Sequence, residues 1–243
     1  MARLRWASGV GSLDAMLAGG FAYGHLHELY AAEAEDMPAT AGFALALGTA
    51  MANAHKHILW LRSYHEDQQH GALQANGWAE LGAEPARWIF GIVANANGLL
   101  KAAVDALRSN ALSAVMVEAD GRFPVLDMIA SRRLVLAAEK SGTPLFLIRT
   151  GSEPRASAAE TRWRISSAPS RALPANAPGA PVFDIELLRQ RSGPSGMRWQ
   201  LEWDRDRRVF IEAAASGALV SAPVRRPAAP AGIEPVRIDE RAA

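Results

Sequence analysis

Short apolar segments typical of strands alternate with helical segments between residues 25 and 149. The strand-like segments are residues 25–30, 57–61, 87–93, 113–119 and 143–149. Helical spacing of apolar residues marks 38–54, 97–110 and 123–142, and an interrupted helical pattern occupies 66–85. Strands that alternate with helices are joined by right-handed crossovers, which build a mostly parallel sheet covered on both faces. The sequence therefore predicts an α/β fold.

The pattern changes after residue 150, where strand-like segments follow one another with few helices between them. These segments are residues 161–165, 181–191, 196–204 and 207–212. Met197, Trp199, Leu201 and Trp203 alternate with polar residues, which is typical of a strand with one buried face. Residues 204–206 fit the turn of a hairpin. We expect these strands to extend the parallel sheet in antiparallel fashion.

Composition narrows the class of protein and the domain boundaries. The chain has 243 residues, no cysteine and a formal net charge of +1, so Cys-based chemistry is excluded and no strongly basic nucleic-acid domain is indicated. It contains no apolar run long enough for a membrane span and no signal-peptide pattern, which predicts a cytoplasmic protein without membrane contact. We expect one domain over 1–212 and a disordered Ala/Pro/Arg-rich tail over 213–243.

The stretch "ASGVGSLDAMLAGGFAYGHLHELY" (7–30) resembles the start of the RecA ATPase core. It carries Ser12-Leu13-Asp14, the pair Gly19-Gly20, Gly24, and a strand with Glu28-Leu29-Tyr30. More narrowly, "RWASGVGSLDAMLAGG" and "HELYA" are similar to the ImuA family of RecA-like, SulA-type damage-inducible proteins. The resemblance covers about residues 5–212 and implies a RecA-like P-loop NTPase fold.

Membership of that family would imply a role in SOS-induced, error-prone DNA synthesis past lesions. The implied partners are ImuB, which is an inactive relative of Y-family polymerases, and an error-prone replicative-type polymerase. RecA itself is a further candidate partner. These expectations come from the resemblance and not from composition or spacing.

The segment that would hold the phosphate loop, "AAEAEDMPATAG" (31–42), lacks the groups that grip a nucleotide. A P-loop needs glycines whose backbone N–H groups approach the phosphates, followed by a lysine and a hydroxyl. Here no glycine lies between Gly24 and Gly42, and the first lysine is Lys56. Thr40 offers a hydroxyl, but Ala39 precedes it, and Pro38 removes a backbone donor. We therefore interpret the segment as a degenerate P-loop.

The same segment adds three carboxylates, Glu33, Glu35 and Asp36, which would repel a polyphosphate. We expect Asp36 to cap the following helix, so that its carboxylate replaces a bound phosphate.

Glu118 holds the Walker B position, and we interpret it as the structural end of a buried strand. Arg62 and Ser63 stand near the place of the catalytic glutamate of RecA-type enzymes. We expect no nucleotide, no cofactor, no metal site and no ATPase activity.

Five residues are candidates for contact with a partner or with nucleic acid. Trp163, flanked by Arg162 and Arg164, is interpreted as an exposed aromatic contact. Arg189 and Arg191 resemble the paired basic residues that RecA uses across a subunit interface. Without nucleotide they would bind an acidic partner or a phosphate backbone. Residues 150–160 carry one arginine, so DNA contact there is expected to be weak or indirect.

Together these observations predict a non-catalytic RecA-like adaptor in SOS-induced translesion synthesis that binds ImuB and, as a second candidate, RecA. Two alternatives remain open from the sequence. One is an atypical RecA-type DNA-dependent ATPase. The other is a SulA-like inhibitor of cell division.

Overall fold

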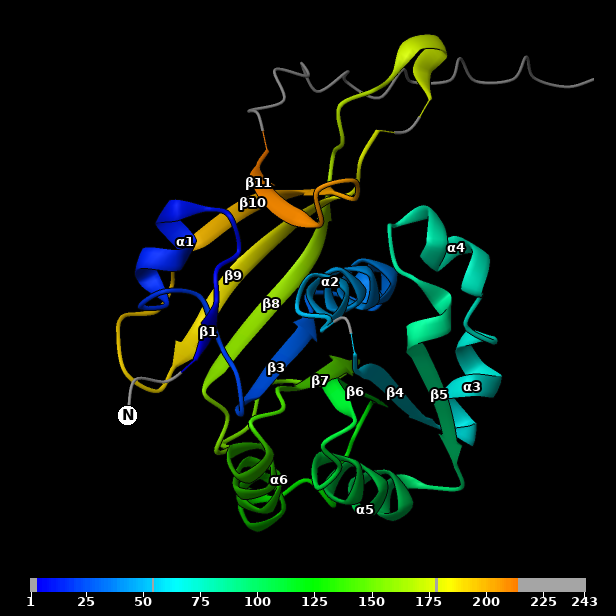
Figure 1. The fold of residues 1–243 in the computed structure, drawn as a ribbon, viewed down its shortest axis with the longest axis vertical. Helices are drawn as coiled ribbons and strands as arrows, with labels where there is room; N and C mark the ends of the chain where they lie inside the picture. Colours follow the sequence, from blue (N-terminus) through cyan, green and yellow to red (C-terminus); the bar gives the residue numbers. More distant parts are fainter. Residues whose placement is uncertain (1–3, 54, 178, 214–243) are drawn as a thin grey trace, which may run out of the picture.

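A computed structural model of the protein describes residues 4–53, 55–177 and 179–213. The segment 213–243 predicted as a disordered tail therefore lies, apart from its first residue, outside the described residues. The described residues contain a nine-stranded sheet with helices on both faces (Figure 1) and a separate two-stranded sheet. None of the helices in this described part has the length and apolar character needed to cross a bilayer.

The sheet has the strand order β11-β10-β9-β8-β3-β7-β6-β4-β5. Its parallel part contains β3 (Leu26–Ala31), β4 (His57–Ser63), β5 (Trp88–Val93), β6 (Leu112–Asp120), β7 (Leu145–Thr150) and β8 (Thr161–Ala168). The antiparallel extension contains β9 (Val182–Gln190), β10 (Arg198–Asp204) and β11 (Val209–Glu212). The predicted fold class, with a parallel centre and antiparallel C-terminal strands, is confirmed.

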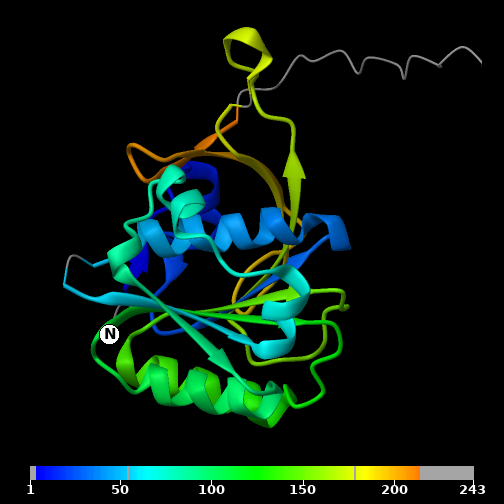
Figure 2. The ribbon, with the colours of Figure 1, turned by 90° about the vertical axis from the view of Figure 1, so that its right-hand side faces the viewer.

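Helices cover the two faces unequally. The apolar helix α2 (Met37–Ala50) lies on one face, where strands β8 to β11 curve around it, and α5 (Ala96–Leu107) and α6 (Met128–Ser141) lie on the other (Figures 1 and 2). Phe43 of α2 contacts Phe183 of β9 at 5.5 Å and Phe210 of β11 at 5.1 Å between ring centroids. Shorter helices are α1 (Gly11–Met16), α3 (Tyr64–His70) and α4 (Ala75–Glu80), with 3-10 turns at Ala34–Asp36, Pro85–Arg87 and Pro174–Asn176.

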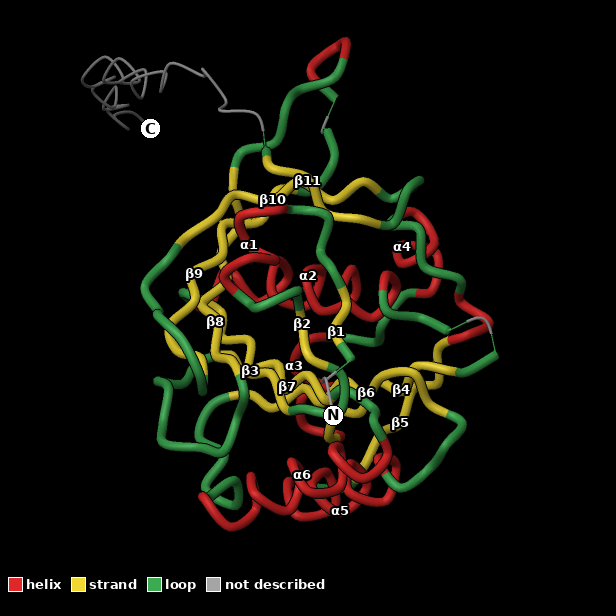
Figure 3. Tube along the Cα trace, turned by 60° about the vertical axis from the view of Figure 1, so that its left-hand side comes forward, coloured by secondary structure: helices red, strands yellow, loops and turns green. Residues whose placement is uncertain are grey.

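The N-terminal segment packs against the antiparallel strands. It contains α1 and the strand pair β1 (Arg5–Trp6) and β2 (Phe21–Ala22), which Figure 3 shows near the N-terminus. The ring centroids of Phe21 and Trp163 of β8 lie 5.4 Å apart, and the indole N–H of Trp199 donates to Ser12 Oγ at 3.1 Å. Gly20 has φ +110°, and a Cβ there would lie 1.9 Å from the Trp6 carbonyl oxygen. The glycine pair of the sequence motif is thus required by the turn that brings β2 back onto β1.

Two local expectations, at the start of α6 and at Met197, differ from the structure. Helix α6 begins at Met128 and not at residue 123, because the Asp127 carboxylate accepts from the Ala130 N–H at 2.7 Å and fixes the start. Helix α1 begins at Gly11, with Val10 at its N-cap. Met197 is 46% exposed and precedes β10, whereas Trp199, Leu201 and Trp203 form the buried face as predicted.

Candidate functional site

The segment between β3 and α2, which the sequence analysis interprets as a degenerate phosphate loop, is a tight connection bound to the neighbouring strand. The Ala32 N–H donates to the Ile165 carbonyl of β8 at 2.8 Å, which continues the sheet pairing past the end of β3. The Asp36 N–H then donates to the Glu33 carbonyl at 3.1 Å within the 3-10 turn. Pro38 follows in the first turn of α2. Two of the loop's backbone donors are therefore already bonded within the chain.

The expectation that Asp36 caps α2 is wrong. Its side chain makes no capping bond. Instead, its Oδ1 accepts from the backbone N–H of Ser167 at 2.9 Å and from the Ser167 hydroxyl at 3.2 Å. The partner lies on β8, 131 residues away, so the carboxylate ties the loop to the sheet and leaves the helix N-terminus uncapped. Its contact could not be foreseen from position in the sequence.

The other loop residues are divided between surface and core. Thr40 is fully buried, and its hydroxyl donates to the Asp36 carbonyl oxygen at 2.9 Å, so it satisfies the helix backbone. Glu33 and Glu35 are exposed. Glu33 borders a cavity of about 330 Å³ together with Tyr30, Glu153 and Arg164. At the position of a phosphate loop the chain thus presents carboxylates to solvent.

Glu118, near the end of β6, is buried and held by two side chains of β4. Its Oε1 lies 2.8 Å from Nη2 of Arg62, and its Oε2 accepts from the Trp60 indole N–H at 3.0 Å. The same guanidinium also donates to the Gly71 carbonyl at 2.8 Å. Both carboxylate oxygens therefore have partners within the chain. A cation that replaced Arg62 would have to break this pair.

The end of β4, near the position of the catalytic glutamate in RecA-type enzymes, is organised as a helix cap. Ser63 and Glu66 form a capping box for α3, since each side chain bonds to the backbone N–H of the other. Glu66 Oε1 also accepts from the Asp120 N–H at 3.3 Å. The nearest acid after β4 is consequently a buried structural group, only 6% exposed.

Asp120, the last residue of β6, lies at the carboxyl edge of the sheet. Burial opposes its ionisation, but hydrogen bonds from the Thr150 hydroxyl at 2.6 Å and the Gly121 N–H at 2.7 Å outweigh it and lower the pKa of Asp120. The His70 ring lies 3.3 Å away. Across the described ranges, no three His, Asp or Glu side chains gather as metal ligands would.

A second buried ion pair joins Glu28 of β3 to Arg162 of β8. Arg162 Nε donates to Glu28 Oε2 at 2.7 Å. The guanidinium groups of Arg162 and Arg149 each lie 5.8 Å from the ring centre of Tyr30. Burial lowers the pKa of Arg149, and burial together with the Glu28 charge raises the pKa of Tyr30. The cluster of Glu28, Tyr30, Arg149 and Arg162 fastens β3 to both of its neighbours.

Sequence reasoning did not assign a role to Glu28, although a signal was present. A carboxylate in the middle of the apolar strand "HLHELY" must find a cation or pay heavily for burial. Arg149 and Arg162, on the two strands that flank β3, were the available cations.

The interpretation of Trp163 as an exposed contact is wrong. Its side chain is fully buried, and its indole N–H donates to the Thr161 hydroxyl at 2.8 Å. Arg162 is 8% exposed and belongs to the buried ion pair, which also corrects its assignment as a surface contact. Flanking arginines do not distinguish an exposed tryptophan from one on the inner face of a strand.

The remaining basic candidates lie on the surface. Arg164 is partly exposed and pairs with Glu186 at 3.1 Å. Arg189 and Arg191 are exposed near the end of β9, and Arg189 Nη1 reaches the carbonyl oxygens of Ser157 and Ala159 at 3.5 and 3.4 Å. The strand register places Arg189 opposite Arg162. These three residues keep accessible charge.

No protein-family model matches this sequence, and no curated protein matches it. Among solved structures, the chain is similar to one described as the RadB recombinase, with 17% sequence identity and a TM-score of 0.56. The match covers 86% of this chain and 99% of that chain. At this identity the likeness concerns the fold alone. The chain therefore has a RecA-like fold.

Proposed function

We propose that this RecA-like domain is a non-catalytic adaptor in SOS-induced, error-prone translesion DNA synthesis. The observation that carries the proposal is the buried contact of Glu118 with Arg62 and Trp60. A RecA-type ATPase uses the Walker B carboxylate to hold Mg²⁺ near the phosphates, whereas here an arginine of the same domain neutralises it. Carboxylates in the loop after β3 add repulsion against a polyphosphate.

The pathway and the partners rest on the sequence resemblance of residues 7–30 to the ImuA family. On that ground we propose ImuB as the principal partner. RecA and the error-prone replicative-type polymerase are further candidates, and any DNA contact is weak or indirect. Surfaces, rather than a bound nucleotide, would carry the function.

The first experiment measures nucleotide binding and hydrolysis. Isothermal titration with ATP and Mg²⁺ is expected to give no saturable heat at millimolar nucleotide, and single-stranded DNA is expected not to stimulate phosphate release. Saturable binding that Glu118→Gln abolishes, while the exposed Glu33→Gln keeps it, would establish the site as a working ATPase centre and overturn the proposal.

The second experiment measures partner capture. Immobilised chain is expected to retain ImuB at micromolar concentration, and Arg191→Glu, which reverses an exposed charge next to the end of β9, is expected to weaken retention. Failure of the native chain to retain ImuB in a purified mixture would remove the partner assignment without affecting the conclusion on ATP.

A further inference from the structure

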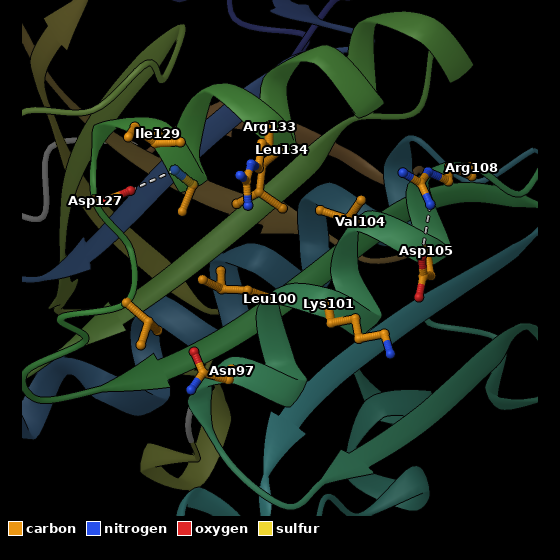
Figure 4. A pocket seen from close by; sticks show the side chains of 12 residues that line it. Asn97, Leu100, Lys101, Val104, Asp105, Arg108, Asp127, Ile129, Arg133 and Leu134 are labelled. Atoms are coloured by element: carbon orange, nitrogen blue, oxygen red, sulfur yellow. Dashed lines mark hydrogen bonds and ion pairs between the residues drawn. The ribbon is translucent and has the colours of Figure 1, made fainter.

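A groove runs between α5 and α6 on the outer side of the sheet (Figure 4). Its volume is about 750 Å³. Leu100 and Val104 of α5 line one side, Ile129 and Leu134 of α6 line the other, and Val125 also lines the groove. A groove with an apolar floor between two helices is suited to receive a third helix.

Helix α6 also leaves apolar side chains uncovered beside this groove. Ile129 is 61% exposed and Leu136 is 65% exposed. They lie seven residues apart, so they occupy the same face of the helix two turns apart. Within the described part of the chain nothing covers this face, which makes it a surface available to another protein.

The charges around the groove are unbalanced. Each acidic side chain already has a contact within the chain: Asp105 pairs with Arg108 at 3.1 Å, Asp127 caps α6, and Glu139 lies 3.9 Å from His25. In contrast, two cations that line the groove, Lys101 and Arg133, make no ion pair with a described residue. The surface therefore attracts a ligand that combines apolar and acidic groups.

We propose that the α5–α6 groove is the docking site for an amphipathic helix of a partner protein, with an apolar stripe flanked by Asp or Glu. Apolar residues of the incoming helix would contact Leu100, Val104 and Ile129. Its acidic residues would pair with Lys101 and Arg133 at the rim. The proposal deepens the adaptor function and rests on it, since an adaptor needs such a surface.

Three other occupants fit less well. A second copy in a two-fold contact would place the same cations against one another. Residues 214–243 of this chain carry four arginines against three acidic residues, so they are not an acidic segment. Nucleic acid would be held through its phosphates, which gain nothing from an apolar floor.

The test uses a fluorescent synthetic helix of about 18 residues, on the order of 27 Å long, with leucine at i, i+3, i+4 and i+7 positions and glutamate elsewhere on the rim. Fluorescence anisotropy with the full chain is expected to show saturable binding. Arg133→Glu and Lys101→Glu should each weaken binding at least tenfold, and a peptide with lysine in place of glutamate should regain affinity for these variants. Arg171→Glu, an exposed change in the β8–β9 connection, should leave binding unchanged.

Several outcomes would overturn the proposal. They are equal affinity in the charge variants, equal binding of a control peptide whose leucines are serines, no binding at millimolar peptide, or binding of single-stranded DNA in place of the peptide with the same residue dependence. Ile129→Ser checks the apolar contact without burying a polar group, and far-UV circular dichroism confirms that each variant is folded. The ATP titration above is independent, so a failed docking test does not count against the loss of nucleotide binding.

Discussion

The guanidinium of Arg62 on β4 lies 2.8 Å from the carboxylate of Glu118 on β6, and both side chains are at most 4% exposed. The strands are parallel neighbours, and β4 lies next to the edge strand β5. A charge pair in this position removes two charged groups from water and survives only because each side chain has further polar partners. The pair therefore commits the Glu118 carboxylate to a contact within the sheet.

Removal of one member of that pair should cost much more than removal of both. Arg62→Ala leaves Glu118 buried without a cation, and we expect the free energy of unfolding to fall by about 3–5 kcal/mol. The double variant Arg62→Met with Glu118→Leu should recover most of this loss, because no charge is then buried. Urea denaturation followed by tryptophan fluorescence measures both; equal losses in the single and double variants would contradict the account.

The stability of a Trp163 variant tests whether this side chain of β8 is buried in the core. Trp163→Ala removes a fully buried ring that contacts Phe21 and Trp199, and it should lower the free energy of unfolding by about 3–5 kcal/mol. Arg191→Ala, an exposed change just after the neighbouring strand β9, should alter it by no more than about 0.5 kcal/mol. Similar midpoints in chemical denaturation for the two variants would show that Trp163 does not pack in the core.

The pH dependence of stability should contain a contribution from His27. Burial lowers the pKa of His27 to about 4 from its ordinary 6.5. Its ring nitrogens lie 2.7 Å from the Thr161 hydroxyl and 2.9 Å from the Ala22 carbonyl oxygen, an arrangement that suits the neutral ring. Between these pKa values the unfolded chain binds the proton and the folded chain does not, so stability falls as pH drops from 6.5 to 4.

The free energy of unfolding lost over that pH interval follows from the size of the His27 pKa shift and is about 3 kcal/mol. Thermal unfolding of the native chain and of His27→Gln across pH 4 to 7 separates this contribution from that of the carboxylates, which both proteins share. The difference between the two proteins should shrink as the pH falls. A constant difference would show that His27 does not titrate as described.

The turn at Gly20 can be tested by comparing the stability of Gly20→Ala with that of a control, Gly77→Ala. Gly20→Ala forces a Cβ onto the Trp6 carbonyl at a positive φ, so we expect a loss of more than about 1 kcal/mol. Gly77 lies in α4 with open space around it, and Gly77→Ala should stabilise the chain by about 0.5–1 kcal/mol. Calorimetric unfolding temperatures should move in opposite directions; a shift of the same sign would contradict the described turn.

The edge strand β5 should influence self-association. Ile89, Phe90 and Ile92 are 45%, 41% and 54% exposed on this strand, which has a neighbour on one side only among the described strands. An apolar edge without charge or proline invites pairing with another strand. Ile92→Lys should reduce light scattering at high protein concentration, whereas Met197→Lys, on an exposed site elsewhere, should not. Unchanged scattering in Ile92→Lys would exclude edge pairing.

The sequence predicted the fold because its parallel strands are short apolar runs and the longer helices between them are amphipathic or wholly apolar. Such patterns are local, so β3 to β7 and the helices between them could be placed from spacing. The contacts of the site are not local. Asp36 binds Ser167 and Glu28 binds Arg162 across more than 130 residues, and no periodicity records such pairs. A charged residue within an apolar strand indicates only that a partner exists.

The same limit explains the error at Trp163. Arg162 and Arg164 suggested an exposed face, yet Arg162 lies on the face that meets Glu28, and its charge is satisfied inside the protein. Alternation along β8 was visible in the sequence, but which of its two faces is buried depends on the helix and strands that cover it. Only the topology, with β8 beside β3, decides that question.

The place of β3 in the sheet also has a consequence for synthesis on the ribosome. Leu26 pairs with Leu145, and His27 pairs with Thr161, so both neighbours of this early strand are made 119 or more residues later. At 5–20 residues per second, β3 and the apolar helix after it wait about 6 to 24 seconds before β7 exists. During that interval the apolar side chains of β3 lack the sheet neighbours that bury them in the folded protein.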